Sequence, residues 1–366
     1  MEWKDGFSAR YYYTIVDAVS WRDLRRYKLT GGSISKTASS LMESASLELT
    51  DIPTENEIWI RVWLDARQNS DGAHEALFTG LLSVPGVEWD GTRRSYNAEC
   101  YSVLKPAADV LLPRGWYAQE GVSGAEQAAN LLGVGAAPVE YDDNSPLLQS
   151  SIVAESSENN LSMAQKIVNA IGWRIRISGN GVIRICPKDN EPAVKFDSLN
   201  NDIIELEMSD QRDWFSCPNV FRATYNGVTA VARDDDPDSP YSIIARGREI
   251  WKEDTTCSLN TNESILQYVA RRLKEEQSPS RICNYSRRYF PDLYPGDAVR
   301  LHYPAQHIDG DFRIRSQQID LGYSARTAEE TEIIVAMRES TIRDKLLVDD
   351  AGDYIVTDDG YCIQIA

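Results

Sequence analysis

Short runs of alternating apolar and polar residues dominate the first hundred positions of the chain. Clear examples are Ser46 to Thr50 and Ile58 to Leu64. Because successive side chains of a β-strand point to opposite faces, this period of two predicts half-buried strands. The Asp90-Gly91 pair lies between two such runs and predicts a tight hairpin turn. Strands at such regular spacing indicate an antiparallel sandwich or barrel over residues 1–100.

Residues 101–204 combine helical spacing of apolar residues with short strand patterns. The segment SGAE at 123–126 is a capping box, which marks the start of a short helix. A second apolar stripe at helical spacing covers residues 158–171, and an alternating hairpin follows over residues 173–185. We expect a compact α/β insertion in which the helical stripe packs on one face of the hairpin.

Regular alternation returns in the second half of the chain. The stretch 214–247 predicts a hairpin whose tip, at 234–240, is crowded with carboxylates and prolines. Further strand patterns follow after residue 284. We therefore expect a second, discontinuous antiparallel barrel formed by residues 205–250 and 284–338.

One helical segment interrupts this barrel within residues 251–283. Its apolar stripe consists of Ile265, Leu266, Val269 and Leu273. Because a single stripe suits packing on a domain surface, we expect the helix to leave the barrel and pack beside the insertion. Residues 339–366 form an acidic tail with two short strand patterns, for which the sequence indicates no role.

The composition limits the classes of function. A chain of 366 residues with 42% hydrophobic residues is expected to form two or three globular domains. Asp and Glu number 56 against 38 Lys and Arg, which gives a formal net charge of −18. Stable nucleic-acid binding is therefore disfavoured, although passage of DNA without binding stays open. No signal-peptide pattern or membrane-length apolar run is present, so membrane insertion is also disfavoured.

The sequence offers little catalytic chemistry. Its three histidines, His74, His302 and His307, are scattered, and neither a zinc spacing nor a serine-nucleophile motif is present. The acidic run 234–238 spaces carboxylates as a calcium loop does, but it lacks the turn glycine and the distant glutamate of such a loop. A solvated turn is favoured there. We predict no catalytic, cofactor-binding or metal-binding residues, and no enzymatic activity.

Tryptophans are the remaining candidates for binding. A sugar-binding face could be lined by Trp59, Trp63, Trp89, Trp116 and Trp173. The other interpretation is packing in cores and interfaces, where tryptophan and tyrosine bury large areas. We favour packing for these residues.

Several motifs follow one another in a fixed order. They are SSENNLSMAQKIVNAIGWRIRISGNGVIRI, CPNVFRATYNGVTAVARDDDPDSPYS, LYPGDAVRL and DGDFRIRSQQIDL. Most of the signal comes from the Pro-Asn pair at 218–219, the turn at 236–240 and the Pro-Gly-Asp turn at 295–297. With this order and spacing, over roughly residues 1–340, the chain resembles the central hub proteins of phage tails and baseplates, including contractile-tail hubs and related injection machines.

The resemblance implies a mainly β fold with an α+β insertion: two tail-tube-like antiparallel β-barrel domains plus a small α/β domain. It also implies a homotrimeric ring that joins the sixfold tail tube, or a distal tail protein, to a central spike, fibre or tip protein. The tape-measure protein is a further candidate partner. Such a hub would be assembled in the host bacterial cytoplasm and located in the virion tail tip or baseplate. A strongly acidic ring would repel DNA phosphates and let DNA slide through.

Two other functions stay open on the sequence. The chain could be a receptor- or cell-wall-glycan-binding tail component, or a tail-associated cell-wall hydrolase. The sequence does not distinguish a contractile from a non-contractile tail.

Overall fold

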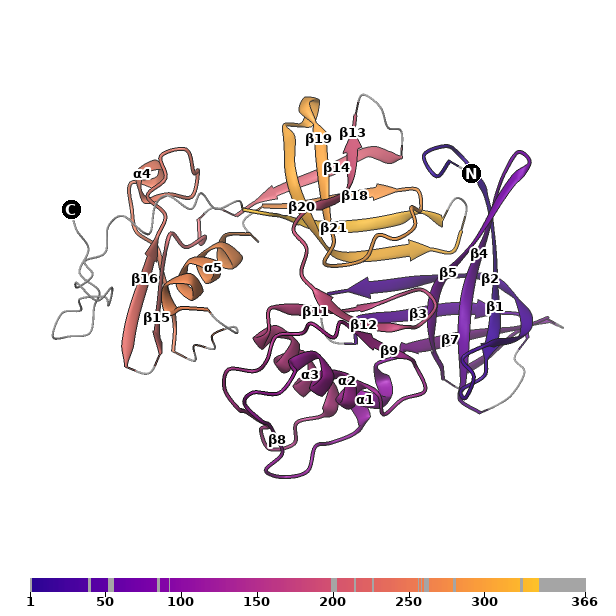
Figure 1. Ribbon diagram of the computed structural model, residues 1–366. Helices are drawn as coiled ribbons and strands as arrows, with labels where there is room; N and C mark the ends of the chain where they lie inside the picture. The colour runs from indigo at the N-terminus through magenta and orange to yellow at the C-terminus, as the bar shows by residue number, and fades with distance from the viewer. Residues whose placement is uncertain are drawn as a thin grey trace. The chain divides into compact units, whose positions relative to one another are not determined.

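The computed structural model describes residues 2–335, apart from short gaps at 39–40, 52–55, 84–85, 92, 199–202, 214, 226, 256, 258, 260–262, 279–280 and 323–324. The acidic tail predicted at 339–366 therefore lies outside the described residues. The chain divides into two compact units (Figure 1). One consists of residues 1–209 and 284–331, and the other is built around residues 210–283. The predicted mainly β fold with a small helical insertion is confirmed.

Six strands of the first unit close into an antiparallel barrel. They are β1 (Ser8–Val16), β2 (Asp23–Thr37), β3 (Glu43–Leu49), β4 (Ile58–Gln68), β5 (Asp71–Leu82) and β7 (Arg93–Ser102). Their order is β1-β4-β5-β7-β3-β2, and β2 pairs again with β1 to close the ring. Alternation places one side of each strand in the core, where Leu47, Ile60 and Phe78 are fully buried. Strand β6 (Gly86–Asp90) pairs with β7 beyond the barrel.

The sheet continues from β2 into a second group of strands. These are β13 (Pro192–Asp197), β14 (Ile204–Arg212), β18 (Arg281–Arg287), β19 (Ala298–Tyr303), β20 (Ile308–Asp320) and β21 (Thr327–Ile333). Strand β20 pairs with β2 through its last residues and with β19 through its first, and the order continues β20-β21-β18-β14. The short 3-10 helix Pro304–Gln306 connects β19 to β20. In the described pairings β13 and β14 do not meet, so this second group is an open sheet.

The insertion has its own core. Its elements are α1 (Lys105–Asp109), β8 (Tyr117–Ala118), α2 (Gly124–Leu132), β9 (Val139–Tyr141), β10 (Ile152–Val153), α3 (Asn160–Ala170), β11 (Trp173–Ile177) and β12 (Ile183–Pro187). Ser123 caps α2 as predicted, because its hydroxyl accepts a hydrogen bond from the Glu126 amide at 3.3 Å. In Figure 1 the helices lie on one side of the β11–β12 hairpin. Val168 and Ile175 belong to the shared core, so the helical stripe packs on the hairpin as predicted.

The second unit is a small three-stranded sheet covered by one helix. It contains β15 (Val220–Tyr225), β16 (Val228–Arg233), α4 (Ile243–Arg246), β17 (Trp251–Asp254) and α5 (Ile265–Gln277). The sheet order is β16-β15-β17, separate from the large sheet. Phe221 and Val269 are both fully buried in the core between α5 and this sheet.

Three predictions about this region are wrong. Residues 218–233 do not join a barrel with 284–338, because they pair only within the small sheet in the described part of the chain. The apolar stripe of α5, expected on the insertion, is covered by β15 and β16 of its own unit. The acidic segment does not form the tip of the hairpin, which turns instead at Gly227. Alternation of apolar and polar residues could not assign a strand to a sheet. It predicts that one face of the strand is buried, but it does not identify the element that covers that face.

Candidate functional surface

A continuous polar face covers the large sheet on the side away from its cores. In β3, Ser44, Ser46 and Glu48 alternate with buried residues and are exposed. Ser46 is paired with Ser33 of β2 on one side and with Glu99 of β7 on the other. Because side chains at paired positions share a face, small polar and acidic groups form rows across these strands.

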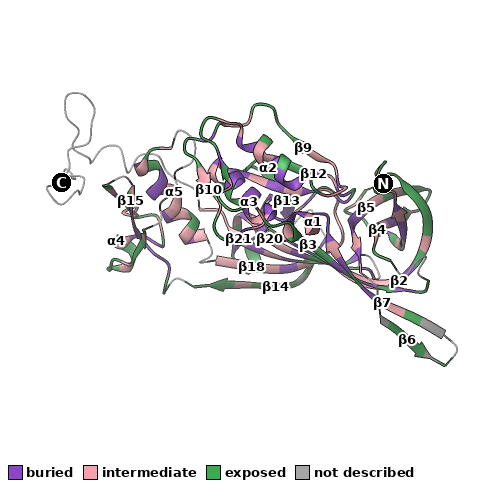
Figure 2. Ribbon diagram, turned by 90° about the horizontal axis from the view of Figure 1, so that it is seen from below, coloured by how far each residue is buried: buried purple, intermediate pink, exposed green. Residues whose placement is uncertain are grey.

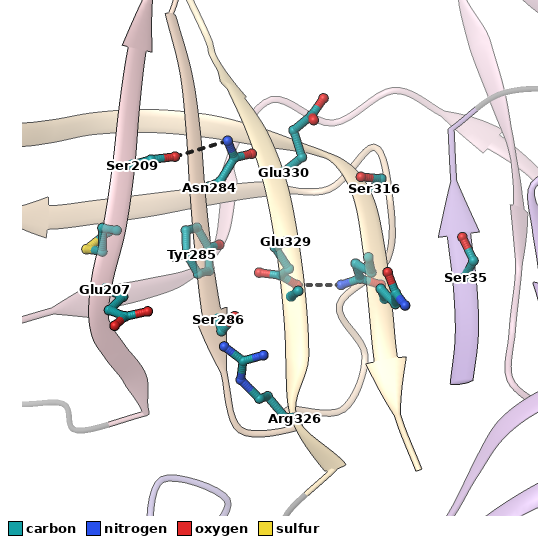
Figure 3. Close-up of a pocket in the computed structure, with 14 residues that line it drawn as sticks. Ser35, Glu207, Ser209, Asn284, Tyr285, Ser286, Ser316, Arg326, Glu329 and Glu330 are labelled. Carbon is teal, nitrogen blue, oxygen red and sulfur yellow. Dashed lines mark hydrogen bonds between the residues drawn. The ribbon is translucent and has the colours of Figure 1, made fainter. Parts of the chain in front are cut away.

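The rows continue onto the second group of strands. Ser35 of β2 is paired with Gln318 of β20, and Asn284 of β18 donates a hydrogen bond to Ser209 of β14 at 3.1 Å. Here the sheet is hollowed by about 480 Å³ (Figure 3). Polar side chains on the lining include those of Ser35, Glu207, Ser209, Asn284, Ser286, Ser316, Gln317, Gln318, Arg326, Glu329 and Glu330. We call the combined surface from β7 to β14 the polar sheet face.

Acidic groups dominate the electrostatics of the polar sheet face. Its exposed carboxylates are Glu48, Glu99, Glu205, Glu207 and Asp320. Two arginines on this face are ion-paired: Arg326 with Glu205 at 2.7 Å, and Arg315 with Glu330 at 3.0 Å. The hydrogen bonds from Arg326 hold the pKa of Glu205 below its usual range. At neutral pH the face is therefore negatively charged, which disfavours contact with phosphate groups.

A buried polar cluster fixes the sheet beneath this face. Arg287 donates to Glu329 at 2.5 Å, and the side chains of this pair are 1% and 0% exposed. Gln317 of β20 donates to the same Glu329 oxygen at 2.6 Å. Since an unpaired buried charge costs several kcal/mol, about 3–5 in measured cases, this cluster ties β18, β21 and β20 together in one register.

The β11–β12 hairpin of the insertion holds the two strand groups in place. At its turn, the Gly179 carbonyl accepts a hydrogen bond from Thr79 of β5 at 2.7 Å. At its other end, Arg174 donates to Asp297 at 2.7 Å. Asp297 also accepts from the Tyr294 amide at 2.9 Å and so closes the Pro-Gly-Asp turn. The insertion is thus bonded to β5 of the barrel and to the turn before β19.

The motif residues singled out in the sequence are structural. Gly296 has φ +92°, a conformation that favours glycine, and so it allows the turn that presents Asp297. Asn219 is fully buried, and its side chain bonds both the Arg248 carbonyl and the Ile250 amide. In the acidic loop, Asp234 accepts hydrogen bonds from Ser239 and from Gln277 of α5.

The histidines, which the sequence offered as candidates for catalysis or metal binding, do not lie together in one site. The side chains of His74 and His302 lie near Asp65 and Asp309, at 3.7 and 3.2 Å, in different parts of the sheet. Among the described residues no group of His, Cys, Asp or Glu side chains could hold a metal ion. No described helix has the length and hydropathy needed to span a membrane.

The tryptophans are mostly packed. Trp173 is buried in the insertion core, and Trp59 and Trp116 pack against it. Trp63 stacks on Tyr12. Trp89 differs from these, because 61% of it is exposed on the projecting strand β6. Neither the polar sheet face nor this exposure was predicted, since pairing of β7, β3, β2 and β20 depends on contacts between distant parts of the chain.

Similar proteins were found by comparison of structures and not by comparison of sequences. No family model and no curated protein sequence matches this chain. A tail protein from Neisseria meningitidis is similar in structure, with a TM-score of 0.64 and 15% identity over 88% of this chain and 96% of that one. The 43 kDa tail protein of prophage MuSo2 from Shewanella oneidensis has a TM-score of 0.63 and 12% identity, with coverage of 88% and 98%.

A third similar structure comes from Escherichia coli. It is a component of the type VI secretion system, described as structurally similar to tail proteins gp27 and gp5 of bacteriophage T4. Its TM-score is 0.50 at 9% identity, with coverage of 92% of this chain and 81% of that one. The likeness to phage tail proteins suggested by the motif order is thus confirmed in three dimensions, and the chain has the fold of phage tail proteins.

Proposed function

We propose that this chain is the structural hub of a phage or phage-like tail tip. Three copies form a ring that joins the sixfold tail tube to a central spike or fibre, and DNA passes through the ring. The observation that carries the proposal is the polar sheet face, which is continuous over two strand groups of one chain and acidic. The fold, which is that of phage tail proteins, supports the same role.

The chemistry of this face suits a channel wall. Serine side chains are short and neutral, and exposed carboxylates repel phosphates over a Debye length of about 8 Å at physiological ionic strength. DNA in such a channel would be repelled from the wall and would not bind to it. The role is structural and not catalytic.

The architecture also suits a symmetry adaptor. Each chain contributes a closed barrel and a second strand group joined to it through β2 and β20. Three such chains would present six strand groups around one axis, which would match a sixfold tube. The partners are then further copies of the chain, a tube or distal tail protein, and a spike, fibre or tip protein, with the tape-measure protein as a further candidate. The site of action is the virion tail tip.

Assembly tests the hub role directly. The purified chain, alone and mixed with the tube and spike proteins encoded beside it, is measured by native mass spectrometry and negative-stain electron microscopy. We expect three-copy rings that cap one end of the tube. Monomers under every condition, with no binding to either neighbour, would contradict the proposal.

Charge reversal tests the channel wall. The triple variant Glu48→Lys, Glu99→Lys, Asp320→Lys should retain DNA in a gel-shift assay at low salt, whereas the unmodified protein should not. The matched control is Glu120→Lys, Asp143→Lys, Glu191→Lys, which makes the same change in net charge at exposed positions outside the polar sheet face. Equal DNA retention by the two triple variants would contradict the proposal, because it would show that added lysines bind DNA equally well outside the polar sheet face.

A further inference from the structure

The first half of β2, together with β1 and β4, carries a basic and aromatic surface on the outside of the barrel. Tyr13 of β1 and its partner Val62 of β4 are fully buried, so the residues that alternate with them face outward. In Figure 2 green, exposed segments run along the outside of this barrel near the N-terminus. We call this surface, with Tyr12 and Trp63 at its centre, the basic barrel face. Its exposed cations are Arg10, Arg26, Lys28 and Arg67.

Two stacked aromatic rings form the centre of the basic barrel face. Tyr12 is paired with Trp63, and their rings lie with centroids 6.2 Å apart and planes 10° apart. The guanidinium carbon of Arg26 lies 3.4 Å from the centroid of the Tyr12 ring, a cation–π contact. The Trp63 indole donates a hydrogen bond to the Thr14 hydroxyl at 3.1 Å. These contacts hold the rings in one orientation before a partner arrives, which lowers the entropic cost of binding.

The carboxylates near this face are already compensated. Asp23 accepts a hydrogen bond from Arg61 at 2.8 Å, and the buried Asp65 lies 3.7 Å from Arg67. Within the described part of the chain, the other three exposed cations of the face form no ion pair with a carboxylate. Because the whole chain has a formal net charge of −18, the basic barrel face is a local positive region on an acidic molecule.

The chemistry of the face fits a protein partner. Tyr, Trp and Arg are the residue types enriched at the centres of protein interfaces, where truncating them costs the most affinity. A positive patch on an otherwise acidic molecule attracts an acidic partner to that patch and fixes its orientation, because the remaining surface repels it.

Nucleic acid fits the face less well. Neighbouring strands lie about 4.8 Å apart, so the face measures roughly 10 Å across β2, β1 and β4. Duplex DNA carries one charge per about 1.7 Å of its axis and would extend beyond this width over an acidic molecule. A short acidic segment of a protein places its carboxylates over the cations alone.

We propose that an acidic segment of another protein docks on the basic barrel face. Its carboxylates lie beside Arg10, Arg26 and Lys28, and one of its apolar side chains packs on the Tyr12–Trp63 stack. This contact shares only β2 with the polar sheet face. The inference does not depend on the hub role, because it follows from the charges and the aromatic geometry of the barrel.

Peptide binding tests the charge of the face. A short fluorescein-labelled oligoglutamate is added to the full-length chain, and binding is measured by fluorescence anisotropy. We expect binding that weakens as salt is raised. The double variant Arg10→Glu, Lys28→Glu should weaken it about tenfold, because each reversal removes an attraction and adds a repulsion. The matched control is Arg114→Glu, Lys195→Glu, which makes the same charge change at exposed positions off the face and should bind as the unmodified chain does.

A second peptide tests the aromatic centre. An oligoglutamate with one central tryptophan should bind the unmodified chain more tightly than oligoglutamate alone, because its ring packs on the Tyr12–Trp63 stack. Trp63→Leu should abolish this gain and leave the affinity for plain oligoglutamate unchanged. Because the comparison is made between two peptides on the same variant, a general loss of folding would lower both affinities together and is distinguishable.

Three results would overturn the proposal. One is equal binding by the two double variants, which would show that the basic barrel face is not the site. Another is the absence of binding by either peptide at low salt. The third is tighter binding of a duplex DNA of matched charge than of the tryptophan peptide, which would assign the face to nucleic acid. The hub role stands or falls separately, on the assembly of rings.

Discussion

Arg174 of the insertion donates a 2.7 Å hydrogen bond to Asp297, which stands in the turn before β19, more than a hundred residues away. The two side chains are only 15% and 7% exposed. Burial lowers the pKa of Arg174, but the charge of Asp297 and the hydrogen bond outweigh it, so that the pKa is raised. This pair attaches the insertion to the second strand group.

Removing the carboxylate should loosen that attachment. We expect Asp297→Ala to lower the free energy of unfolding by about 2–4 kcal/mol, because Arg174 would keep a largely buried charge without its partner. Urea denaturation measures the change. The control is Glu140→Ala, which breaks the Arg184–Glu140 pair at the same 2.7 Å distance but with side chains 61% and 53% exposed. That exposed pair should contribute about 0–1 kcal/mol. Equal effects of the two variants would contradict the importance of burial.

Close approach of the hairpin turn to β5 gives a second prediction. A Cβ on Gly179 would lie 1.6 Å from the Ala76 carbonyl oxygen. Gly179→Ala should therefore cost roughly 1–3 kcal/mol, the range for overpacking, and make the insertion sensitive to limited proteolysis. Gly72→Ala is the control, because its Cβ would meet nothing nearer than 3.5 Å. Unchanged proteolysis of Gly179→Ala would show that the turn does not dock on β5.

Acid should weaken the insertion through Glu158. Burial raises the pKa of this carboxyl, but hydrogen bonds from the Glu155 amide and from Lys166 outweigh it, and the pKa lies below 4.5. A depressed folded-state pKa contributes stability above the unfolded value, and this stability is lost as pH falls through the folded value. Glu158→Gln should thus lower stability at pH near 7, and its effect should shrink as the pH falls below the unfolded-state pKa of the carboxyl.

Glu155 provides the control for this pH effect. It also bonds Lys166, at 2.9 Å, but its side chain is 80% exposed. Glu155→Gln should leave the pH dependence of urea denaturation close to that of the unmodified protein. A similar loss at pH near 3 and pH near 7 for Glu158→Gln would contradict the assignment.

Val168 tests whether the insertion is a separate folding unit. It is 2% exposed in the insertion core. Val168→Asp buries an unpaired carboxylate at a cost of several kcal/mol, roughly 3–5, so the insertion should unfold locally. Limited proteolysis should then cut within residues 101–204 first. Cleavage spread evenly along the chain would show that the insertion does not unfold by itself.

The sequence by itself determined several of the elements and the cap of α2. The alternation from Ile58 to Leu64 is strand β4, and SGAE at 123–126 starts α2 with Ser123 as its cap. These features follow from the spacing of side chains along a few residues, which local geometry fixes. The motif order also indicated the fold of phage tail proteins, although no sequence relative matched.

Tertiary structure alone decided which elements share a sheet. Alternation in β15 and β16 was assigned to the second barrel, yet these strands belong to a separate sheet covered by α5. The polar sheet face could not be predicted from the sequence for the same reason. Ser33, Ser46 and Glu99 come together only through strand pairing. Alternation of apolar and polar residues predicts that one side of a strand is buried and the other is solvated. Which strand pairs with it depends on the packing of the whole chain.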